Sequence, residues 1–229
     1  MTLDYSRHKN ILLQILKDIF SDTSISPYLA FKGGTAALMF YGLDRNSVDI
    51  DLDLLDESKE QEVFEKIQKI VSGYGRVVDS RIKRFSLTTI ISYDLKSQNV
   101  KVEVNRRDFG SKYELKTLLG ISMLVMTRED MFAHKLMAMY ERIGKTNRDV
   151  YDVYFFSKNN WPINKQLVES RAKMPFKEVL AKCIELLDKM DNRHILDGLG
   201  EILTEPQKDW ARAKLRAETK FYLEALLVS

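Results

Sequence analysis

The segment YLAFKGGTAALMFYGLDRNSVDIDLDLL, residues 28–55, contains the features that decide the fold. A short apolar run leads into a Gly-Gly pair, and a strictly alternating run of aspartate and aliphatic residues follows after a loop. Glycine pairs between periodic segments are typical of turns, and period-two alternation is typical of a half-buried strand. The segment therefore predicts a strand, a Gly-Gly turn, a helix over about 35–41, a loop and a second strand.

Three aspartates, Asp49, Asp51 and Asp53, occupy alternate positions in the second predicted strand. Side chains two residues apart on a strand share a face, so the carboxylates point one way and the aliphatic residues between them point into a core. Two carboxylates on one face can bind a divalent cation, which substrate phosphates commonly complete. We expect Asp49 and Asp51 to bind Mg²⁺ or Mn²⁺. The alternative is an exposed edge strand whose charges serve solubility.

The motif Lys32-Gly33-Gly34-Thr35 precedes the aspartate strand by one predicted helix. Glycines at that place let backbone N–H groups approach a phosphate, and the helix N-terminus adds partial positive charge. For the motif alone, a structural turn capped by Thr35 is an equally good reading. A phosphate-binding turn followed by a same-face carboxylate pair is the arrangement that metal-assisted phosphoryl transfer requires. The combination is therefore more specific than either part.

A third carboxylate is expected from the predicted strand over residues 100–105, where valines point inward and Glu103 faces out with Lys101. If this strand neighbours the aspartate strand, Glu103 completes the metal site. Asp53 is the other candidate for the third carboxylate. A surface face of alternating Lys and Glu is the alternative explanation for Glu103.

The rest of the chain divides into an α/β part and a helical part. The other elements expected from periodicity are an amphipathic helix around residues 11–19, a polar helix over 58–72, a hairpin over 76–95, helices over 129–143 and 148–157, and three amphipathic stretches after Trp161. Thr127 with Asp130 resembles a shortened N-cap box, and Asn147 is placed to cap the following helix. Every segment after about residue 117 is expected to be helical. The sequence thus predicts an α+β fold, with a mixed sheet and flanking helices over residues 1–120 and a helical region over 121–229.

Composition is that of an ordinary globular protein, with 229 residues of which 45% are hydrophobic and 30% charged. The apolar stretches are too short for a membrane helix, and the charged N-terminus does not resemble an export signal, so we expect a cytoplasmic protein without a membrane span. A net charge of +3 is too small to indicate nucleic-acid binding by itself. The single cysteine, Cys183, lies in an apolar helical run and is expected to be buried as a small hydrophobic residue.

Together the motifs resemble those of the AbiEii/AbiGii-type nucleotidyltransferase toxins, which belong to the DNA polymerase β-like superfamily. The shared patterns are KGGTxL, here with one additional residue before the leucine, and RxSxDIDL, which begins at Arg45. Two later elements also match, a lysine in HKLMAMYER (residues 134–142) and an RDxxD motif over residues 148–152. The resemblance covers roughly residues 30–157 and implies a nucleotidyltransferase-like fold.

What the resemblance implies about the site is specific. Asp49 and Asp51 would bind the metal, and Lys135 would bind the triphosphate of the NTP substrate. An aspartate of the RDxxD element, Asp149 or Asp152, would complete the site and act as the base on the acceptor. The residues implied for binding the NTP phosphates, as members of the first two motifs, are Lys32, Gly33, Gly34, Thr35, Arg45 and Ser47.

Helical spacing alone leaves another role open for these later residues. Asp149 and Asp152 share a helix face, and a lysine is a good point charge for a polyphosphate. A salt bridge between Lys135 and either aspartate explains the same pattern without a ligand. His134 is expected to be a packing or surface residue.

The acceptor of the nucleotide is predicted to be RNA. Basic residues cluster in the predicted hairpin and directly after the Glu103 strand, and a basic stripe runs along the last helix. The resemblance supports this, because some family members modify the tRNA acceptor end and arrest growth, and such toxins are encoded with a cognate antitoxin. The alternatives are a transferase acting on a small molecule or protein side chain, and a non-catalytic pseudo-enzyme that binds nucleotide or RNA. The basic residues in question are Arg81, Lys83, Arg84, Arg106 and Arg107, and in the last helix Arg212, Arg216 and Lys220.

Overall fold

The computed structural model describes residues 4–94 and 99–228; Leu95, expected to end the hairpin, lies outside these residues. The chain forms two compact units. The first comprises Met1–Gly42, Asn46–Asp108 and Lys112–Met126, and the second comprises Leu43–Arg45, Phe109–Ser111 and Thr127–Ser229. Each unit is described by itself.

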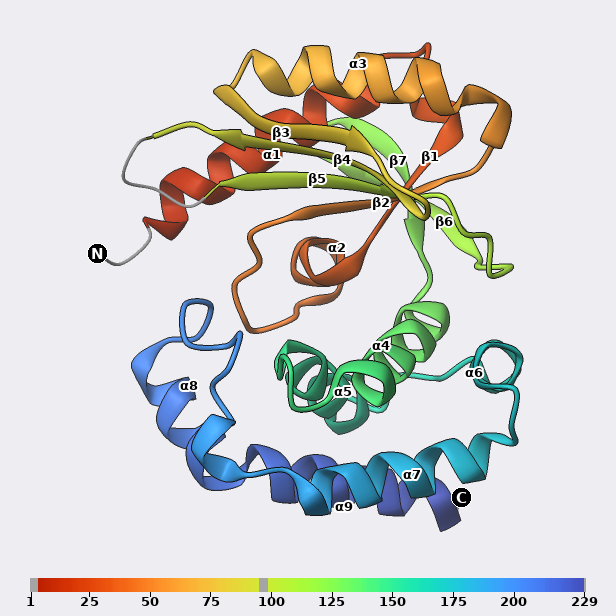
Figure 1. Cartoon of the computed structure of the whole chain (residues 1–229), viewed down its shortest axis with the longest axis vertical. Coiled ribbons are helices and arrows are strands. Elements are labelled where there is room, and N and C mark those ends of the chain that lie inside the picture. The colour runs from red at the N-terminus through yellow and green to blue at the C-terminus, as the bar shows by residue number, and fades with distance from the viewer. Residues whose placement is uncertain (1–3, 95–98, 229) are drawn as a thin grey trace. The chain divides into compact units, whose positions relative to one another are not determined.

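The first unit is a sheet with three helices (Figure 1). Its helices are α1 (Tyr5–Ser21), α2 (Gly33–Tyr41) and α3 (Glu60–Ser72), and its strands are β1 (Leu29–Lys32), β2 (Ile50–Leu54), β3 (Arg76–Ile82), β4 (Ser86–Ser92), β5 (Val100–Asn105), β6 (Tyr113–Leu118) and β7 (Ile121–Met126).

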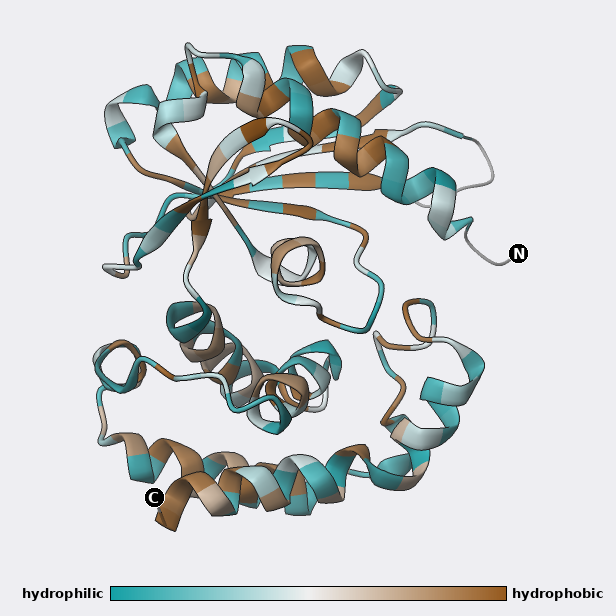
Figure 2. Cartoon of the chain, turned by 180° about the vertical axis from the view of Figure 1, so that it is seen from behind, coloured by the Kyte–Doolittle hydropathy of each residue, from teal (hydrophilic) through white to brown (hydrophobic). Residues whose placement is uncertain are grey.

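All seven strands form one mixed sheet in the order β3-β4-β5-β2-β1-β7-β6. The aspartate strand β2 lies near the middle, antiparallel to β1 and parallel to β5. Hydrophobic and hydrophilic residues alternate along the long strands (Figure 2), as expected for a sheet whose two faces have different surroundings. The predicted α+β fold with a mixed sheet is confirmed.

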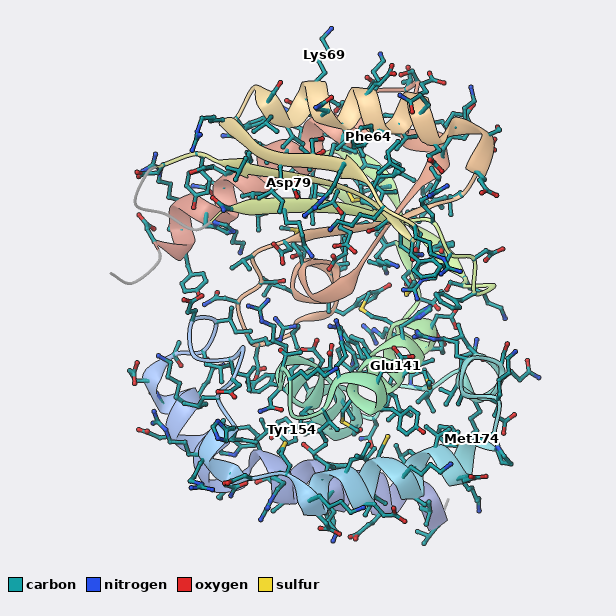
Figure 3. The ribbon with its side chains drawn as sticks, viewed as in Figure 1. Phe64, Lys69, Asp79, Glu141, Tyr154 and Met174 are labelled. Atoms are coloured by element: carbon teal, nitrogen blue, oxygen red, sulfur yellow. The ribbon has the colours of Figure 1, made fainter. Side chains whose placement is uncertain are left out.

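The helices of this unit cover the two faces unequally. Helices α1 and α3 lie on one face, and α2 lies on the other (Figure 1). The buried side of α3 consists of Val63, Ile67 and Val71, at the four-residue spacing of one helix face. Its outer side is charged, and Lys69 projects from it away from the sheet (Figure 3). The first residue of α2, Gly33, lies against the side chain of Asp51, so the carboxylates of β2 lie on the face that carries α2.

The second unit is helical. Its helices are α4 (Arg128–Arg142), α5 (Arg148–Lys158), α6 (Lys165–Ala172), α7 (Phe176–Lys189), α8 (Glu205–Trp210) and α9 (Arg216–Val228). Helix α4 packs against α5, α6 and α7, and α9 packs against α5 and α7. Aromatic residues fill the centre, where Phe156 stacks on Trp161 with ring centroids 4.0 Å apart. Cys183 is fully buried as expected, and burial raises the pKa of its thiol to about 12.

The largest error of the sequence-based prediction concerns residues 113–126. Helix was expected after about residue 117, but this segment forms the antiparallel hairpin β6–β7, and the helical part begins only after Thr127. The polar helix, the first hairpin and the strand over residues 100–105 were predicted correctly. Among the described residues, no helix combines the length and apolarity that crossing a membrane requires.

Two predicted helix caps are not formed by side chains. Thr127 precedes α4 as predicted, but its buried hydroxyl has no hydrogen-bond partner among the residues that the structure describes, and Asp130 instead accepts a hydrogen bond from Asn164. Asn147 precedes α5, but its amide donates to the backbone carbonyls of His194 and Ile195. Both residues therefore mark the start of a helix, but neither caps it with its side chain.

Candidate functional site

The central feature of the first unit is an acidic face on β2 and β5. The two strands are parallel neighbours, and Asp51 lies opposite Glu103 in their register. Paired residues of adjacent strands project to the same face, so both carboxylates lie on the face that also carries Asp49. Ile50 and Leu52 are fully buried on the opposite face. The predicted alternation of β2, and its adjacency to the Glu103 strand, are confirmed.

Lys101 lies among these carboxylates. Its Nζ is 2.8 Å from Glu103 Oε2 and 4.0 Å from Asp49 Oδ2. Burial alone would lower the pKa of the Lys101 ammonium, but the surrounding carboxylates, with Asp51 the strongest, raise it above its ordinary value. Burial likewise favours a higher pKa for Glu103, and the contact with Lys101 reverses this and lowers it. The charge of Lys101 thus offsets part of the negative charge of the three acids on this face.

The donor set of this face fits a hard divalent cation. Carboxylate oxygens are the ligands that Mg²⁺ and Mn²⁺ prefer, and Mg²⁺ is commonly held by one or two carboxylates together with substrate phosphates. Within residues 4–94 and 99–228, no three acidic, histidine or cysteine side chains are grouped closely enough to form a complete metal site by themselves. Asp49 and Asp51 would hold such an ion, with Glu103 beside them, only if phosphate oxygens supply further ligands.

Asp53 has a different role from the other two aspartates. It is only 5% exposed, and its Oδ1 accepts hydrogen bonds from Lys32 Nζ at 2.5 Å and from Asn105 Nδ2 at 2.7 Å. The hydroxyl of Tyr113 donates to its other oxygen at 3.0 Å. Asp53 thus joins β1, β2, β5 and β6, which favours Glu103 as the third carboxylate. The same contact commits the Lys32 ammonium to Asp53 in this structure.

The Gly-Gly turn lies directly against Asp51. Helix α2 begins at Gly33, two residues earlier than expected, and Gly33 has φ +78°. A Cβ atom built on Gly33 would overlap the Asp51 carboxylate, 2.9 Å from Asp51 Cβ and 3.0 Å from Cγ. Only glycine combines this backbone conformation with so close an approach. The two parts of the predicted motif, the glycine turn and the carboxylate strand, are therefore in contact.

Thr35 and Ser47 fix the loop that leads into β2. The fully buried Thr35 has its Oγ1 2.8 Å from Ser47 Oγ, and it also hydrogen-bonds to the backbone carbonyl of Asp49. Thr35 does not cap its own helix, because Lys32 is the N-cap residue. The structure assigns Thr35 a positioning role, and Ser47 is the more accessible of the two hydroxyls.

Two residues, Lys101 and His8, make contacts at this site that the sequence did not predict. The prediction placed Lys101 on the outer face beside Glu103 without assigning it a function. His8, on α1, makes contacts that the sequence does not predict: its Nε2 lies 2.9 Å from the backbone carbonyl of Val48 and its Nδ1 2.7 Å from the hydroxyl of Tyr93. Burial lowers the pKa of His8, so the neutral ring braces the residue that precedes Asp49. Spacing along the sequence carried no signal for this contact.

The second unit contains a buried network of ion pairs around the RDxxD element. Lys135 Nζ lies 3.0 Å from Asp149 Oδ1 and 2.7 Å from Asp152 Oδ2. Arg45 donates two hydrogen bonds to Asp152, at 2.6 and 2.7 Å, and Arg142 contacts Asp149 at 2.7 Å. The salt bridge that was the alternative explanation for Lys135 is thus present in the structure. Binding of NTP by Lys135 stays a prediction, and so does a phosphate contact for Arg45.

This network keeps Asp152 ionised. Burial would raise the pKa of Asp152, but Arg45 and Lys135 outweigh it and lower the value to about 2. Burial would lower the pKa of Lys135, and the two aspartates raise it. His134, next in the chain, contacts Ser111 Oγ and Arg171 Nη1 at 2.7 Å each, in agreement with the packing role expected for it.

The basic stripe formed by Arg212, just before α9, and by Arg216 and Lys220 within α9 is less available than its sequence indicates. Lys220 contacts Asp188 at 2.7 Å, Arg212 contacts Asp209 at 2.7 Å, and Arg216 donates to the carbonyl of Met190 at 2.8 Å. Each cation has an intramolecular partner that a phosphate would have to replace.

Comparisons with known proteins address the family and the fold of this chain. Residues 14–221 match the family described as nucleotidyl transferase AbiEii toxin of the type IV toxin–antitoxin system. A candidate nucleotidyltransferase from Helicobacter pylori has a similar structure, with TM-score 0.68 and 19% identity, over 100% of this chain and 96% of the other. The protein JHP933 from Helicobacter pylori is similar at TM-score 0.67 and 18% identity, over 100% of this chain and 94% of the other.

At these identities the two structures show a shared fold. A comparison with curated proteins finds no match. The family match spans most of the chain, including the glycine turn, the carboxylate strand and the RDxxD element. The chain therefore belongs to the AbiEii family of nucleotidyl transferase toxins of type IV toxin–antitoxin systems, and it is a nucleotidyltransferase.

Proposed function

We propose that this nucleotidyltransferase uses a divalent metal on Asp49 and Asp51 to transfer a nucleoside monophosphate from an NTP to RNA, with a tRNA end as the acceptor. The observation that supports this most strongly is the contact between Gly33 and Asp51 beside Glu103. It brings a backbone suited to phosphate to within van der Waals distance of a carboxylate suited to a metal. Family membership supplies the NTP substrate and an antitoxin partner.

The proposed reaction is an in-line displacement at the α-phosphorus of the NTP. A hydroxyl oxygen of the acceptor forms a new bond to that phosphorus, the bond to the bridging oxygen breaks, and pyrophosphate leaves. A bound Mg²⁺ would neutralise charge that develops on the phosphate oxygens. In this proposal Gly33, Gly34 and Ser47 bind the phosphates of the NTP, and the acidic face orients the acceptor hydroxyl.

The proton of the acceptor hydroxyl passes to a carboxylate of the acidic face in this proposal. Asp152 is poorly suited to that role, because a pKa of about 2 makes it a weak base and both of its oxygens are held by cations. Lys135 is proposed to contact the triphosphate on the strength of the motif resemblance. A toxin with an RNA acceptor acts where RNA is, which places it in the cytoplasm.

The acceptor can be identified directly. The protein is incubated with each α-labelled NTP in turn, Mg²⁺ and total RNA, and the label is followed into RNA, protein and small-molecule fractions. Label in RNA, concentrated in the tRNA size range, supports the proposal. Label in a small molecule or in protein side chains, and none in RNA, contradicts the RNA acceptor while leaving the transferase activity in place.

A further inference from the structure

The turn between β3 and β4 is braced by Arg106, the residue that directly follows β5. Arg84 and Phe85 are the two turn residues, and Lys83 N–H donates to the Ser86 carbonyl at 2.8 Å. The backbone N–H of Arg106 donates to the Phe85 carbonyl at 3.0 Å. Its guanidinium donates to the carbonyl of Lys83 at 3.0 Å and to that of Arg84 at 3.4 Å. Three successive carbonyls of the turn are thus held by one residue.

This brace presents an aromatic ring at the surface. The side chain of Phe85 is 46% exposed, although a phenylalanine is normally buried. The guanidinium of Arg84 lies 4.9 Å from the ring centroid, and that of Arg107 lies 5.1 Å from it. Both guanidinium groups lie over the ring, and an exposed layer of phenylalanine and arginine is a surface on which a flat base can stack.

Charge around the ring favours a polyanion. Lys83, Arg84 and Arg107 are exposed, and neither Lys83 nor Arg84 forms an ion pair with any residue in the described part of the chain. Arg81 contacts Asp79 on β3, which Figure 3 labels, at 3.0 Å. Arg106 is paired with Glu60. Lys83 and Arg84, which form no ion pair within the described residues, therefore place their charge at the turn itself, and Lys83 also acts electrostatically on Glu103.

The turn lies close to the acidic face along the sheet. The carbonyl of Phe85 accepts a hydrogen bond from Arg106, which follows Glu103 by three residues along the chain. At about 3.3 Å per strand residue, the ring lies roughly 10 Å along the sheet from Glu103. That is about the length of three stacked bases at 3.4 Å each.

We propose that Phe85, flanked by Arg84 and Arg107, is a stacking platform for an unpaired base of the acceptor RNA. The base stacks on the ring, and the neighbouring phosphates contact Lys83 and the two arginines. Aromatic stacking combined with basic side chains is how proteins hold single strands without reading their sequence. This inference rests on the proposed function, and it names single-stranded RNA near the acceptor end as what the turn holds.

The test uses binding rather than transfer. A fluorescent single-stranded RNA of about twelve nucleotides is titrated with the intact protein in EDTA, without NTP, so that catalysis is not required. Phe85→Ala should weaken binding by roughly five- to 100-fold, the range found for loss of one stacked base. Phe85→Trp, which keeps an aromatic ring, should bind the RNA about as tightly as the wild type does. The paired change Arg84→Gln with Arg107→Gln should reduce the slope of log K against log salt by about 1.4, or 0.7 for each lost phosphate contact.

Matched controls separate stacking from loss of apolar surface. Ile82→Ala removes an exposed apolar side chain, 41% exposed, from the same hairpin, and Phe221→Ala removes an exposed aromatic ring on α9, 63% exposed. Both variants should bind the RNA as the wild type does. If Ile82→Ala weakens binding as much as Phe85→Ala, the hairpin offers a general apolar surface and the platform is contradicted.

Two further measurements show whether the stacked base belongs to the RNA or to the NTP. Calorimetric titration of the Phe85→Ala variant with NTP should give the wild-type affinity; weakened NTP binding with unchanged RNA binding would assign the ring to the nucleotide donor and overturn the proposal. Unchanged RNA binding by Phe85→Ala overturns it as well. Failure of the wild-type protein to label RNA in the transfer assay contradicts the proposed function, which is a separate outcome from these binding results.

Discussion

The side chain of Asp51 lies directly against the backbone of Gly33, where φ is +78° and no room is left for a Cβ atom. Gly33→Ala should therefore lose stability through backbone strain, by about 1–3 kcal/mol, and lose transfer activity because Asp51 is displaced. Chemical denaturation and the initial rate of nucleotide transfer measure the two effects.

Gly42 provides the control for Gly33. It also has positive φ, +73°, but a Cβ atom there would meet nothing within 4 Å. Gly42→Ala should show the strain without the loss of activity. If both variants lose activity to the same extent, the contact with Asp51 has no special importance.

Lys101 competes with a metal ion for the acidic face. Lys101→Gln should lower the Mg²⁺ concentration that gives half-maximal transfer by about two- to fivefold, because a partly exposed ion pair contributes up to about 1 kcal/mol. The same variant should be less stable without metal, since the three acids then repel one another. Lys116→Gln, which removes a lysine from the edge strand β6, is the control and should leave the Mg²⁺ dependence unchanged. A higher Mg²⁺ requirement for Lys101→Gln would show that the lysine supports the metal or the phosphates.

Lys135 has a structural contact and a proposed ligand contact, and the two are separable. Lys135→Ala should lower the free energy of unfolding by about 1–3 kcal/mol, because Asp149 and Asp152 lose a shared buried partner. If Lys135 also binds the triphosphate, the folded variant should bind NTP about 1.5–3 kcal/mol more weakly in a calorimetric titration.

Arg142→Ala is the matched variant for Lys135. It removes the other partner of Asp149, but Arg142 is 52% exposed, so its effect on stability should be below about 1 kcal/mol. Its NTP affinity should equal that of the wild type. Normal NTP binding by folded Lys135→Ala would leave the lysine with the structural role alone.

The ion pairs of Asp152 predict a pH dependence of stability. Its pKa is lowered to about 2 in the folded protein, against an ordinary value of 3.8, so the folded state binds fewer protons than the unfolded state. Its contribution, about 2 kcal/mol, is complete above pH 4 and is lost as the pH falls from about 4 to 2. Denaturation of the wild type and of Asp152→Asn over this range should show a smaller pH slope for the variant. Equal slopes would mean that Asp152 is not held ionised by Arg45 and Lys135.

Local periodicity was sufficient to predict the central strands. The alternation around Asp51 and that around Glu103 each have a period of two, and each strand has one buried face. What sequence could not supply was the set of contacts across strands. The burial of Asp53 depends on Lys32, Asn105 and Tyr113 meeting in the folded sheet, and no spacing along the chain reports that meeting.

The missed hairpin β6–β7 has a local cause. Its turn is Leu119-Gly120, which lacks the asparagine, aspartate or proline that usually marks a turn, and Leu119 adopts φ +51°. Leu115 and Leu119 are both 70% exposed, so the apolar pattern of this segment does not follow its buried face. Continuous apolar runs of this kind do not distinguish strand from helix.

The most direct test of the metal-dependent transfer concerns Asp51. Asp49→Asn, Asp51→Asn and Asp79→Asn are compared with the wild type for incorporation of labelled nucleotide at saturating Mg²⁺ and NTP, with thermal unfolding as the check on folding. Asp79, on the edge strand β3, is the control and should retain wild-type activity. The account predicts folded Asp49 and Asp51 variants without measurable transfer. A folded Asp51→Asn protein that transfers nucleotide at close to the wild-type rate would contradict it.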